Sequence, residues 1–131
     1  MGAHKPVNVL LVDDSAFFRE MLTPVLKAAG YKVISAASAE QALEILASGV
    51  RIDVLITDVE MPGRDGFHLV EAIRGHGGLA DLPVIALSSG VSPEAIDQAR
   101  KLKISEFVAK FDRSGLVSAL AETQPVLGEA A

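Results

Sequence analysis

One short stretch constrains the fold most: a run of β-forming residues from Val54 to Thr57 that ends in the carboxylate of Asp58. Such a run is typical of a strand buried on both faces in the middle of a parallel sheet. In open α/β sheets the carboxyl ends of the strands border the crevice in which ligands bind. Pro62 and Gly63 predict a turn just beyond the acid. Asp58 is therefore the first candidate for a functional residue, although a carboxylate at this position can also simply cap a loop.

The rest of the chain repeats this alternation of a short apolar run and a helical pattern. Potential caps at Ser15, Ser38 and Ser92 precede helical segments, and Gly30 ends the first of them. Strands that alternate with helices fold as a parallel sheet with helices on both faces. We therefore predict an α/β, flavodoxin-like three-layer sandwich of five βα units with strand order 2-1-3-4-5. The expected strands cover residues 7–12, 31–37, 52–57, 84–87 and 106–109.

Length and composition limit the chain to one domain and few classes of partner. In 131 residues with 50% hydrophobic composition, we expect a domain over residues 7–122, a disordered segment at 1–6 and a flexible tail at 123–131. A net charge of −5 without a basic groove argues against nucleic acid as a partner. No apolar run reaches the roughly 18 residues of a membrane-spanning helix. The absence of cysteine is compatible with a reducing cytoplasm, where we expect the protein to work.

Chemistry-bearing side chains follow four of the predicted strands. Asp13 and Asp14 follow the first, Asp58 the third, Ser88 the fourth and Lys110 the fifth. Because parallel strands end at one edge of the sheet, these side chains should meet there. The neighbouring first and third strands would bring three carboxylates together, and these repel one another unless a cation is present. Mg²⁺ is the expected cation because it prefers oxygen ligands.

A phosphoryl group on Asp58 would find suitable partners at this edge. It carries about two negative charges and three acceptor oxygens. Mg²⁺, the ammonium of Lys110 and the hydroxyl of Ser88 match those charges and oxygens. The pattern therefore predicts in-line phosphoryl transfer to a carboxylate.

These residues, in this order and at these strand ends, make the chain resemble a receiver domain of a two-component response regulator over residues 7 to about 122. The likeness is carried by Asp13-Asp14, Asp58 with Met61-Pro62-Gly63 and Asp65-Gly66, Ser88 and Lys110. By position, the resemblance implies that Asp58 is the phosphoacceptor. It also implies an Mg²⁺ site held directly by Asp14, through water by Asp13 and through the backbone carbonyl of Glu60. Ser88 would be the switch hydroxyl, Lys110 the phosphate partner and Phe107 the switch aromatic.

The resemblance also implies a signalling cycle without turnover of a separate substrate. A histidine kinase would present a phosphohistidine, Asp58 would take the phosphoryl group, and the domain would later hydrolyse it. The face formed by the fourth and fifth helices and the fifth strand would change with the state of Ser88 and Phe107 and contact a downstream or sibling signalling protein. Gly90, which has no side chain to shield the phosphorus, and Glu60 lead us to expect fairly rapid self-dephosphorylation.

Two positions depart from the family pattern. Phe111 follows Lys110 where the family usually has a proline in a cis bond, and Lys103 stands where glycine is common. Because a non-proline cis bond costs about 3 to 4 kcal/mol, we predict a trans bond at Lys110-Phe111.

Other segments point towards one subfamily. The runs Lys110 to Leu116 and Asp14 to Arg19, with Pro24 in the first helix, resemble receivers attached to chemotaxis kinases. On this reading the domain would be part of a hybrid chemotaxis kinase, or a phosphate sink.

Three alternatives remain open at this stage. A phosphatase with an aspartate nucleophile would also use Asp58 and Lys110, but 131 residues leave no cap domain around a substrate. An FMN carrier shares the fold, yet Asp13-Asp14 would repel the phosphate of the cofactor. A receiver fold used as an unphosphorylated binding module is disfavoured because the complete set of acids and lysine is present.

Overall fold

The computed structural model describes residues 7–59, 66–90 and 92–123 as a five-stranded parallel sheet with helices on both faces. The strand order is β2-β1-β3-β4-β5, which confirms the predicted topology. The strands are β1 (Val7–Val12), β2 (Tyr31–Ala36), β3 (Val54–Asp58), β4 (Val84–Ser88) and β5 (Glu106–Ala109). The predicted boundaries hold within two residues, and β3 and β4 each extend one residue further, so that Asp58 and Ser88 are the last residues of their strands.

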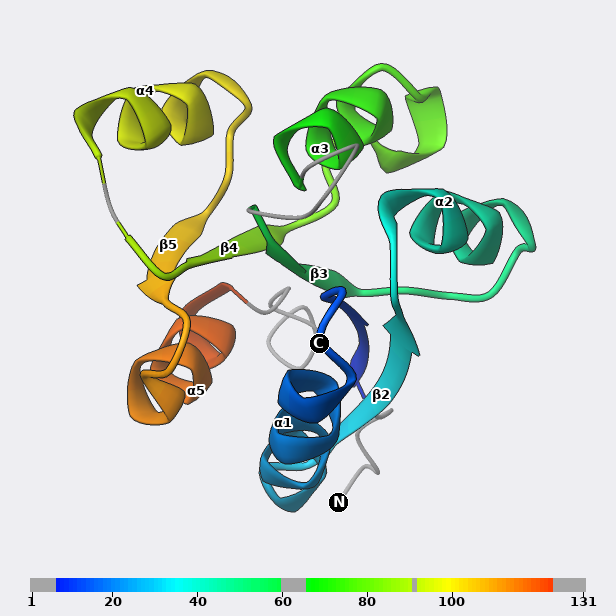
Figure 1. Cartoon of the computed structure of the whole chain (residues 1–131). Helices are drawn as coiled ribbons and strands as arrows, with labels where there is room; N and C mark the ends of the chain where they lie inside the picture. Colours follow the sequence, from blue (N-terminus) through cyan, green and yellow to red (C-terminus); the bar gives the residue numbers. More distant parts are fainter. Residues whose placement is uncertain (1–6, 60–65, 91, 124–131) are drawn as a thin grey trace.

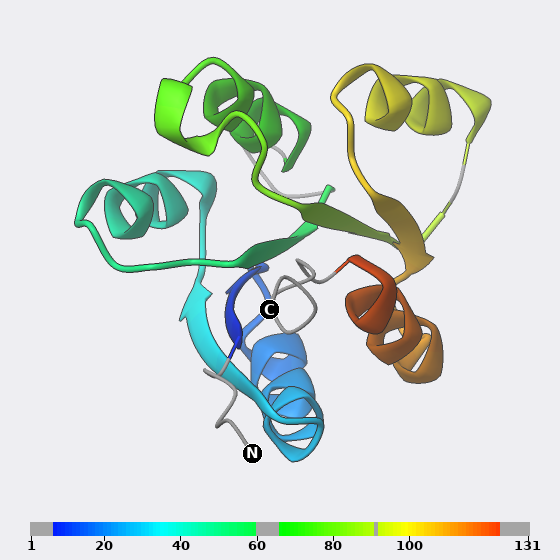
Figure 2. The same ribbon diagram turned by 180° about the vertical axis from the view of Figure 1, so that it is seen from behind.

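The helices form the two outer layers of the sandwich. In Figure 1, α1 and α5 lie on one side of the sheet, and α2, α3 and α4 lie on the other; Figure 2 shows the same arrangement from behind. None of the described helices is long and apolar enough to cross a membrane. The helices are α1 (Ala16–Ala28), α2 (Ala39–Ala47), α3 (Gly66–Arg74), α4 (Pro93–Lys101) and α5 (Arg113–Thr123). A short 3₁₀ helix, η1 (Gly77–Leu79), lies between α3 and β4.

Alternation along the central strands divides the core into two layers. In β1, Val9 and Leu11 pack with α1 and α5, whereas Leu10 and Val12 pack with α2 and α3. Successive side chains of a strand point to opposite faces, so a strand covered on both sides must be apolar throughout. This explains why the central strands read as largely apolar runs, and why the buried Asp58 and Ser88 stand at the last positions of β3 and β4.

Polar side chains begin the helices at the positions where the sequence places them. The hydroxyls of Ser15, Ser38 and Ser92 accept hydrogen bonds from backbone N–H groups in the first turns of α1, α2 and α4. The Asp112 carboxylate accepts from the N–H of Gly115 at the start of α5. These bonds satisfy donors that have no partner inside the helix.

One half-buried arginine joins two loops at the edge of the sheet opposite the strand carboxyl ends. Arg74 donates from Nε to the carbonyl of Leu102 at 2.9 Å and from Nη2 to that of Lys103 at 3.1 Å. Its Nη1 donates to the carbonyls of Leu82 at 2.7 Å and Ala80 at 3.1 Å. Arg74 therefore ties the end of α4 to the segment that leads into β4.

The ends of three helices use a left-handed backbone conformation. Gly30 after α1 has φ of +100° and Gly49 after α2 has φ of +90°, but the corresponding residue after α4 is Lys103, with φ of +59°. A residue with a Cβ atom pays about 1 to 2 kcal/mol in this region, whereas glycine does not. The family departure noted at Lys103 is therefore a strained position.

Replacing Lys103 by glycine should raise the free energy of unfolding by about 0.5 to 1 kcal/mol, because relief of the strain exceeds the extra entropy of the unfolded chain. Urea denaturation would measure the change. Lys103→Ala removes the lysine side chain beyond Cβ but keeps Cβ itself, so its free energy of unfolding should stay close to that of the wild type. Equal stabilisation by alanine and glycine would show that backbone strain is not the cause.

The remaining sequence predictions for the chain ends and one site residue lie outside the described residues. These are the segment 1–6, the tail beyond Thr123, and the stretch from Glu60 to Asp65, which contains the proposed metal ligand Glu60.

Candidate functional site

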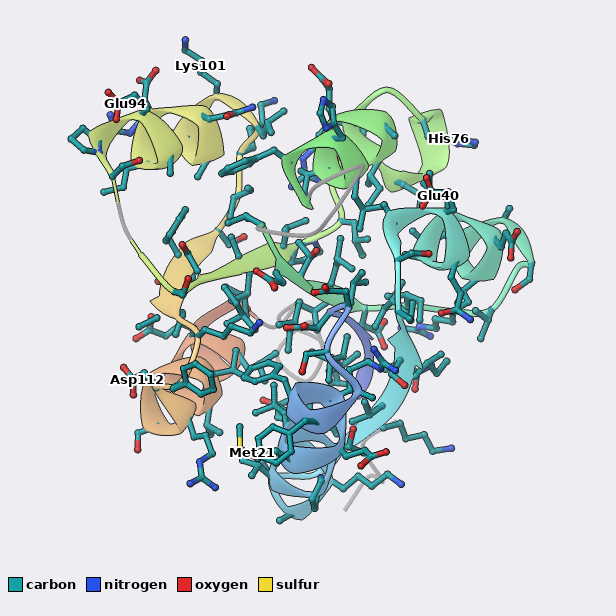
Figure 3. All side chains as sticks on the ribbon, viewed as in Figure 1. Met21, Glu40, His76, Glu94, Lys101 and Asp112 are labelled. Carbon is teal, nitrogen blue, oxygen red and sulfur yellow. The ribbon has the colours of Figure 1, made fainter. Side chains whose placement is uncertain are left out.

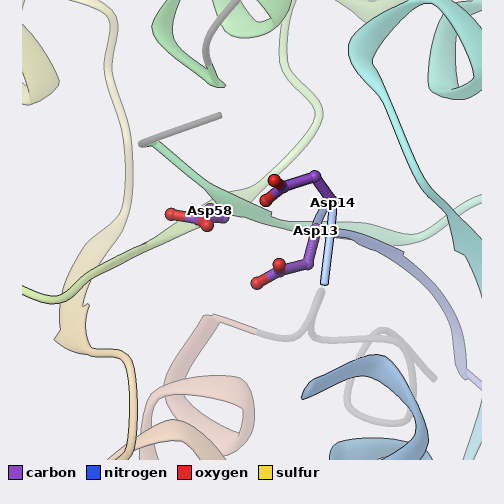
Figure 4. A group of neighbouring side chains, drawn as sticks. All are labelled: Asp13, Asp14 and Asp58. Carbon is purple, nitrogen blue, oxygen red and sulfur yellow. The ribbon is translucent and has the colours of Figure 1, made fainter. Parts of the chain in front are cut away.

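Three carboxylates meet at the carboxyl ends of β1 and β3. These strands are neighbours, with Val12 paired to Thr57, so the residues that follow lie side by side. One oxygen atom from each of Asp13, Asp14 and Asp58 lies within 4.8 Å of the other two. Figure 4 shows the three side chains grouped at this edge. The predicted convergence of the acids is confirmed.

The first acid is held rigidly in the interior. Asp13 is fully buried, and its Oδ1 accepts a hydrogen bond from the N–H of Ser15 at 2.8 Å. Its N–H donates to the carbonyl of Ala36 at 3.1 Å, and its carbonyl accepts from the guanidinium of Arg19 at 2.6 Å. Asp14, in contrast, is exposed, so the cluster opens to solvent on the Asp14 side.

Lys110 places an ammonium between two of the carboxylates. Its Nζ lies 3.0 Å from Asp58 Oδ2 and 3.1 Å from Asp13 Oδ2. Burial lowers the pKa of this ammonium, but its hydrogen bonds to Asp58 and Asp13 and the attraction of the same carboxylates outweigh burial, so the pKa of Lys110 lies above its ordinary value. The lysine is therefore positively charged at neutral pH.

The acidic cluster also suits a hard divalent cation. Asp13 Oδ2 is buried and accepts no well-oriented hydrogen bond within the described part of the chain. Its contact with Lys110 is an ion pair, whose energy depends less on direction than that of a hydrogen bond. A buried carboxylate oxygen with unused acceptor capacity, beside two further carboxylates, matches the oxygen ligands that Mg²⁺ takes. Asp13, Asp14 and Asp58 therefore fit a divalent metal.

Ser88 lies on β4, the strand next to that of Asp58, and Phe107 lies on β5, one strand further out. Asp58 is paired with Leu87, so Ser88 is one residue further along β4. The buried Ser88 hydroxyl donates to the carbonyl of Gly90 and accepts from the N–H of Gly90 at 3.1 Å. Phe107 is half-buried and packs in a cluster with Val59, Phe67, Ala86 and Ala99.

Two aromatic rings adjoin Lys110, and the sequence did not identify their role. Nζ of Lys110 lies 4.8 Å from the centroid of the Phe18 ring, and Phe18 meets Phe111 edge to face with centroids 5.6 Å apart. Phe18 is a core residue at 2% exposure, and helical spacing in the sequence cannot reveal a distant lysine above its ring. No described residue has a cis peptide bond, which confirms the predicted trans bond at Lys110-Phe111.

A glycine allows one helix to pack directly against the site. A Cβ atom on Gly66, the first residue of α3, would lie 2.3 Å from the carbonyl oxygen of Asp58 and 2.9 Å from Cα of Val59. Non-bonded atoms do not approach one another this closely, so only glycine lets α3 lie at this distance from the end of β3.

Comparison with known proteins agrees with this geometry. A two-component response regulator of Oryza sativa subsp. japonica, ORR6, is 32% identical over 120 residues, which cover 90% of this chain and 71% of that protein. A gliding motility regulatory protein of Myxococcus xanthus is 40% identical over 92 residues, 70% of this chain but 12% of that protein. The structure of the Vibrio cholerae chemotaxis protein CheY4 superposes with a TM-score of 0.84 and 33% identity over 91% of this chain and 99% of that one. The family model of the response regulator receiver domain matches residues 9–121, and the chain therefore belongs to this family.

Proposed function

We propose that the protein accepts a phosphoryl group on Asp58 from the phosphohistidine of a histidine kinase, in an Mg²⁺-dependent reaction. Receiver domains are signalling domains that work with histidine kinases and bind Mg²⁺ at an acidic pocket. The observation that carries the proposal for this chain is the ammonium of Lys110, held 3.0 Å from Asp58 beside two further carboxylates. A lone structural aspartate would need no such surroundings.

The described side chains support each part of this transfer. A carboxylate oxygen of Asp58 would attack the phosphorus while the bond from phosphorus to the histidine nitrogen breaks. The ammonium of Lys110 would then face the oxygens of the transferred group and stabilise their charge. Asp13, Asp14 and the backbone carbonyl of Glu60 would hold Mg²⁺ together with Asp58, and the metal would neutralise the developing negative charge.

We propose that Ser88 and Phe107 transmit the change in charge. The Ser88 hydroxyl is engaged with the backbone of Gly90, two residues on in the segment that leads to α4. A phosphoryl group on Asp58 offers this hydroxyl a stronger, charged acceptor. Its movement would release the Gly90 backbone and allow Phe107, now half-buried, to pack further inward. The surface formed by α4, β5 and α5 would then differ between the two states and select a signalling partner.

A place in chemotaxis is the favoured context within this function. The likeness to the Vibrio cholerae chemotaxis protein and to the Myxococcus xanthus gliding motility regulatory protein supports this context. The chain matches only a small part of the Myxococcus xanthus protein. We propose a cytoplasmic receiver that belongs to a hybrid chemotaxis kinase or serves as a phosphate sink. Phosphotransfer from a panel of purified histidine kinases would test this, and transfer from a chemotaxis kinase should be fastest.

Intact-mass measurement tests the central proposal. The protein is incubated with a small phosphodonor and Mg²⁺, beside an Asp58→Asn variant and a sample with EDTA. We expect a gain of one phosphoryl group in the wild type, no gain in Asp58→Asn, and none with EDTA. No gain in the wild type, with Mg²⁺ still bound, would instead identify a binding module that keeps the site without using it.

The absence of a side chain at position 90 leads to a prediction about phosphoryl lifetime. A Cβ atom on Gly90 would meet open space, so the backbone accepts a side chain at this position. Gly90→Arg should shield the phosphorus from water and lengthen the phosphoaspartate half-life roughly 3- to 10-fold, which corresponds to about 1 kcal/mol of barrier. Gly90→Ala, too short to reach, is the matched control. An equal half-life in the arginine variant and the wild type would refute shielding.

A further inference from the structure

We propose that Phe18 is a positioning residue for phosphoryl transfer, because its ring holds the ammonium of Lys110 in the direction of Asp58, and that Phe111 holds the ring. This inference rests on the proposed function for its kinetic consequence. The contacts themselves are present without any phosphoryl group. Lysine needs such support because its long side chain has many rotamers, whereas the transferred group requires the ammonium in one place.

The ring of Phe18 is a rigid platform. It is 2% exposed and belongs to the core cluster between the sheet and helices α1 and α5. Nζ of Lys110 lies 4.8 Å from the ring centroid, within the range in which the negative face of an aromatic ring attracts a cation. Only 15% of the Lys110 side chain is exposed, so little water competes for the ammonium. The ring thus contributes a third attraction besides Asp13 and Asp58.

Phe111 packs against the ring of Phe18. Its ring meets that of Phe18 at an interplanar angle of 87°, with centroids 5.6 Å apart, a favourable edge-to-face geometry. Phe111 is nevertheless 67% exposed, so burial alone does not explain its place. It directly follows Lys110, whose N–H donates to the carbonyl of Ser88 at 2.9 Å. The aromatic pair therefore fixes the backbone on one side of Lys110, and the sheet fixes it on the other.

A double-variant cycle tests the positioning role. Phosphorylation rates with acetyl phosphate and Mg²⁺ are compared for wild type, Phe18→Leu, Lys110→Met and the combined variant. Phe18→Leu should slow the reaction about 5-fold, the loss expected for a partly desolvated cation–ring contact. In the Lys110→Met background the same substitution should change nothing further, because the ammonium is gone. Independent, multiplied effects of the two substitutions would overturn the proposal.

A spectroscopic measurement tests the contact without any chemistry. In protein labelled with ¹³C-lysine, the ε-methylene resonance of Lys110, assigned by its loss in Lys110→Met, should be shifted by the ring of Phe18. It should move towards the position of exposed lysines in Phe18→Leu. An unmoved resonance would overturn the proposal. If the wild type takes no phosphoryl group, the proposed function fails, while this resonance still decides whether Phe18 holds the lysine.

Two further variants complete the design. Phe111→Leu changes an exposed side chain, so it keeps the test decisive even if Phe18→Leu does not fold; the rate and the Lys110 resonance should change in the same direction and by less. Phe17→Leu is the matched control on the same helix, since the Phe17 side chain is 74% exposed. We expect wild-type rate and resonance in Phe17→Leu, and an effect equal to that of Phe18→Leu would contradict the role of the buried ring.

Discussion

Replacing Lys110 by methionine should slow phosphoryl transfer to Asp58 by about 100-fold, the usual cost of removing one preorganised charge from a reacting centre. Methionine keeps much of the apolar stem but carries no charge opposite the phosphoryl oxygens. Single-turnover phosphorylation with acetyl phosphate at saturating Mg²⁺ would measure the rate. A rate within threefold of wild type would show that Lys110 is a structural partner of the carboxylates and takes no part in transfer.

The same variant should bind Mg²⁺ more tightly, by roughly 10-fold, because one positive charge within a few ångströms of the cluster has been removed. Titration calorimetry would measure the affinity. Lys101→Met makes the same change in net charge on the exposed side of α4 (Figure 3), whereas the acidic cluster lies at the ends of β1 and β3 (Figure 4), so it should leave the affinity unchanged. Lys110→Arg keeps the charge, so its metal affinity should remain close to wild type while its transfer rate falls. Tighter binding in Lys101→Met would point to a general charge effect.

Replacing Gly66 by alanine should lower the free energy of unfolding by about 2 to 3 kcal/mol, because the added methyl group forces α3 away from the end of β3. Its Cβ atom would lie 2.3 Å from a backbone oxygen of Asp58, which is held in the sheet and cannot yield as a flexible side chain would. Alanine is otherwise the better helix former by about 1 kcal/mol, so propensity alone predicts the opposite sign. Urea denaturation, followed by circular dichroism, would show whether the free energy of unfolding falls or rises.

Gly75→Ala provides the matched control for this substitution. Gly75 lies just beyond the other end of α3, where a Cβ atom would be 3.7 Å from the nearest backbone oxygen, an ordinary contact. Its stability should stay within about 0.5 kcal/mol of wild type. The Gly66→Ala variant should also accept phosphoryl groups more slowly, since the clash bears directly on the backbone of the acceptor. Equal stability of the two variants would mean that α3 shifts freely over β3.

The sheet and the acidic cluster could be predicted from the sequence because both depend on order along the chain. Apolar runs such as Val7 to Val12 fix the strands, and parallel topology then brings the residues after them to one edge. Asp13, Asp14, Asp58 and Lys110 therefore meet as the sequence indicates. The predicted caps were also confirmed, since a cap depends only on its own helix.

Contacts between distant side chains could not be predicted in this way. The helical spacing of Phe18 indicates burial but not which cation lies over the ring. Arg74 reads as a basic residue in the last turn of a helix, yet the carbonyls it binds belong to loops separated from it by up to 29 positions. The left-handed backbone of Lys103 was likewise hidden, because the chain uses lysine where glycine marks such a turn elsewhere.

The bonds of Arg74 have a mechanical consequence for α4. They anchor the carboxyl end of this helix, through Leu102 and Lys103, to the body of the domain. The amino end at Pro93 follows the segment from Ser88, where a change in hydrogen bonding would begin. Because Arg74 holds the carboxyl end of α4 in place, a small displacement beside Ser88 would move the amino end of this helix more than its carboxyl end.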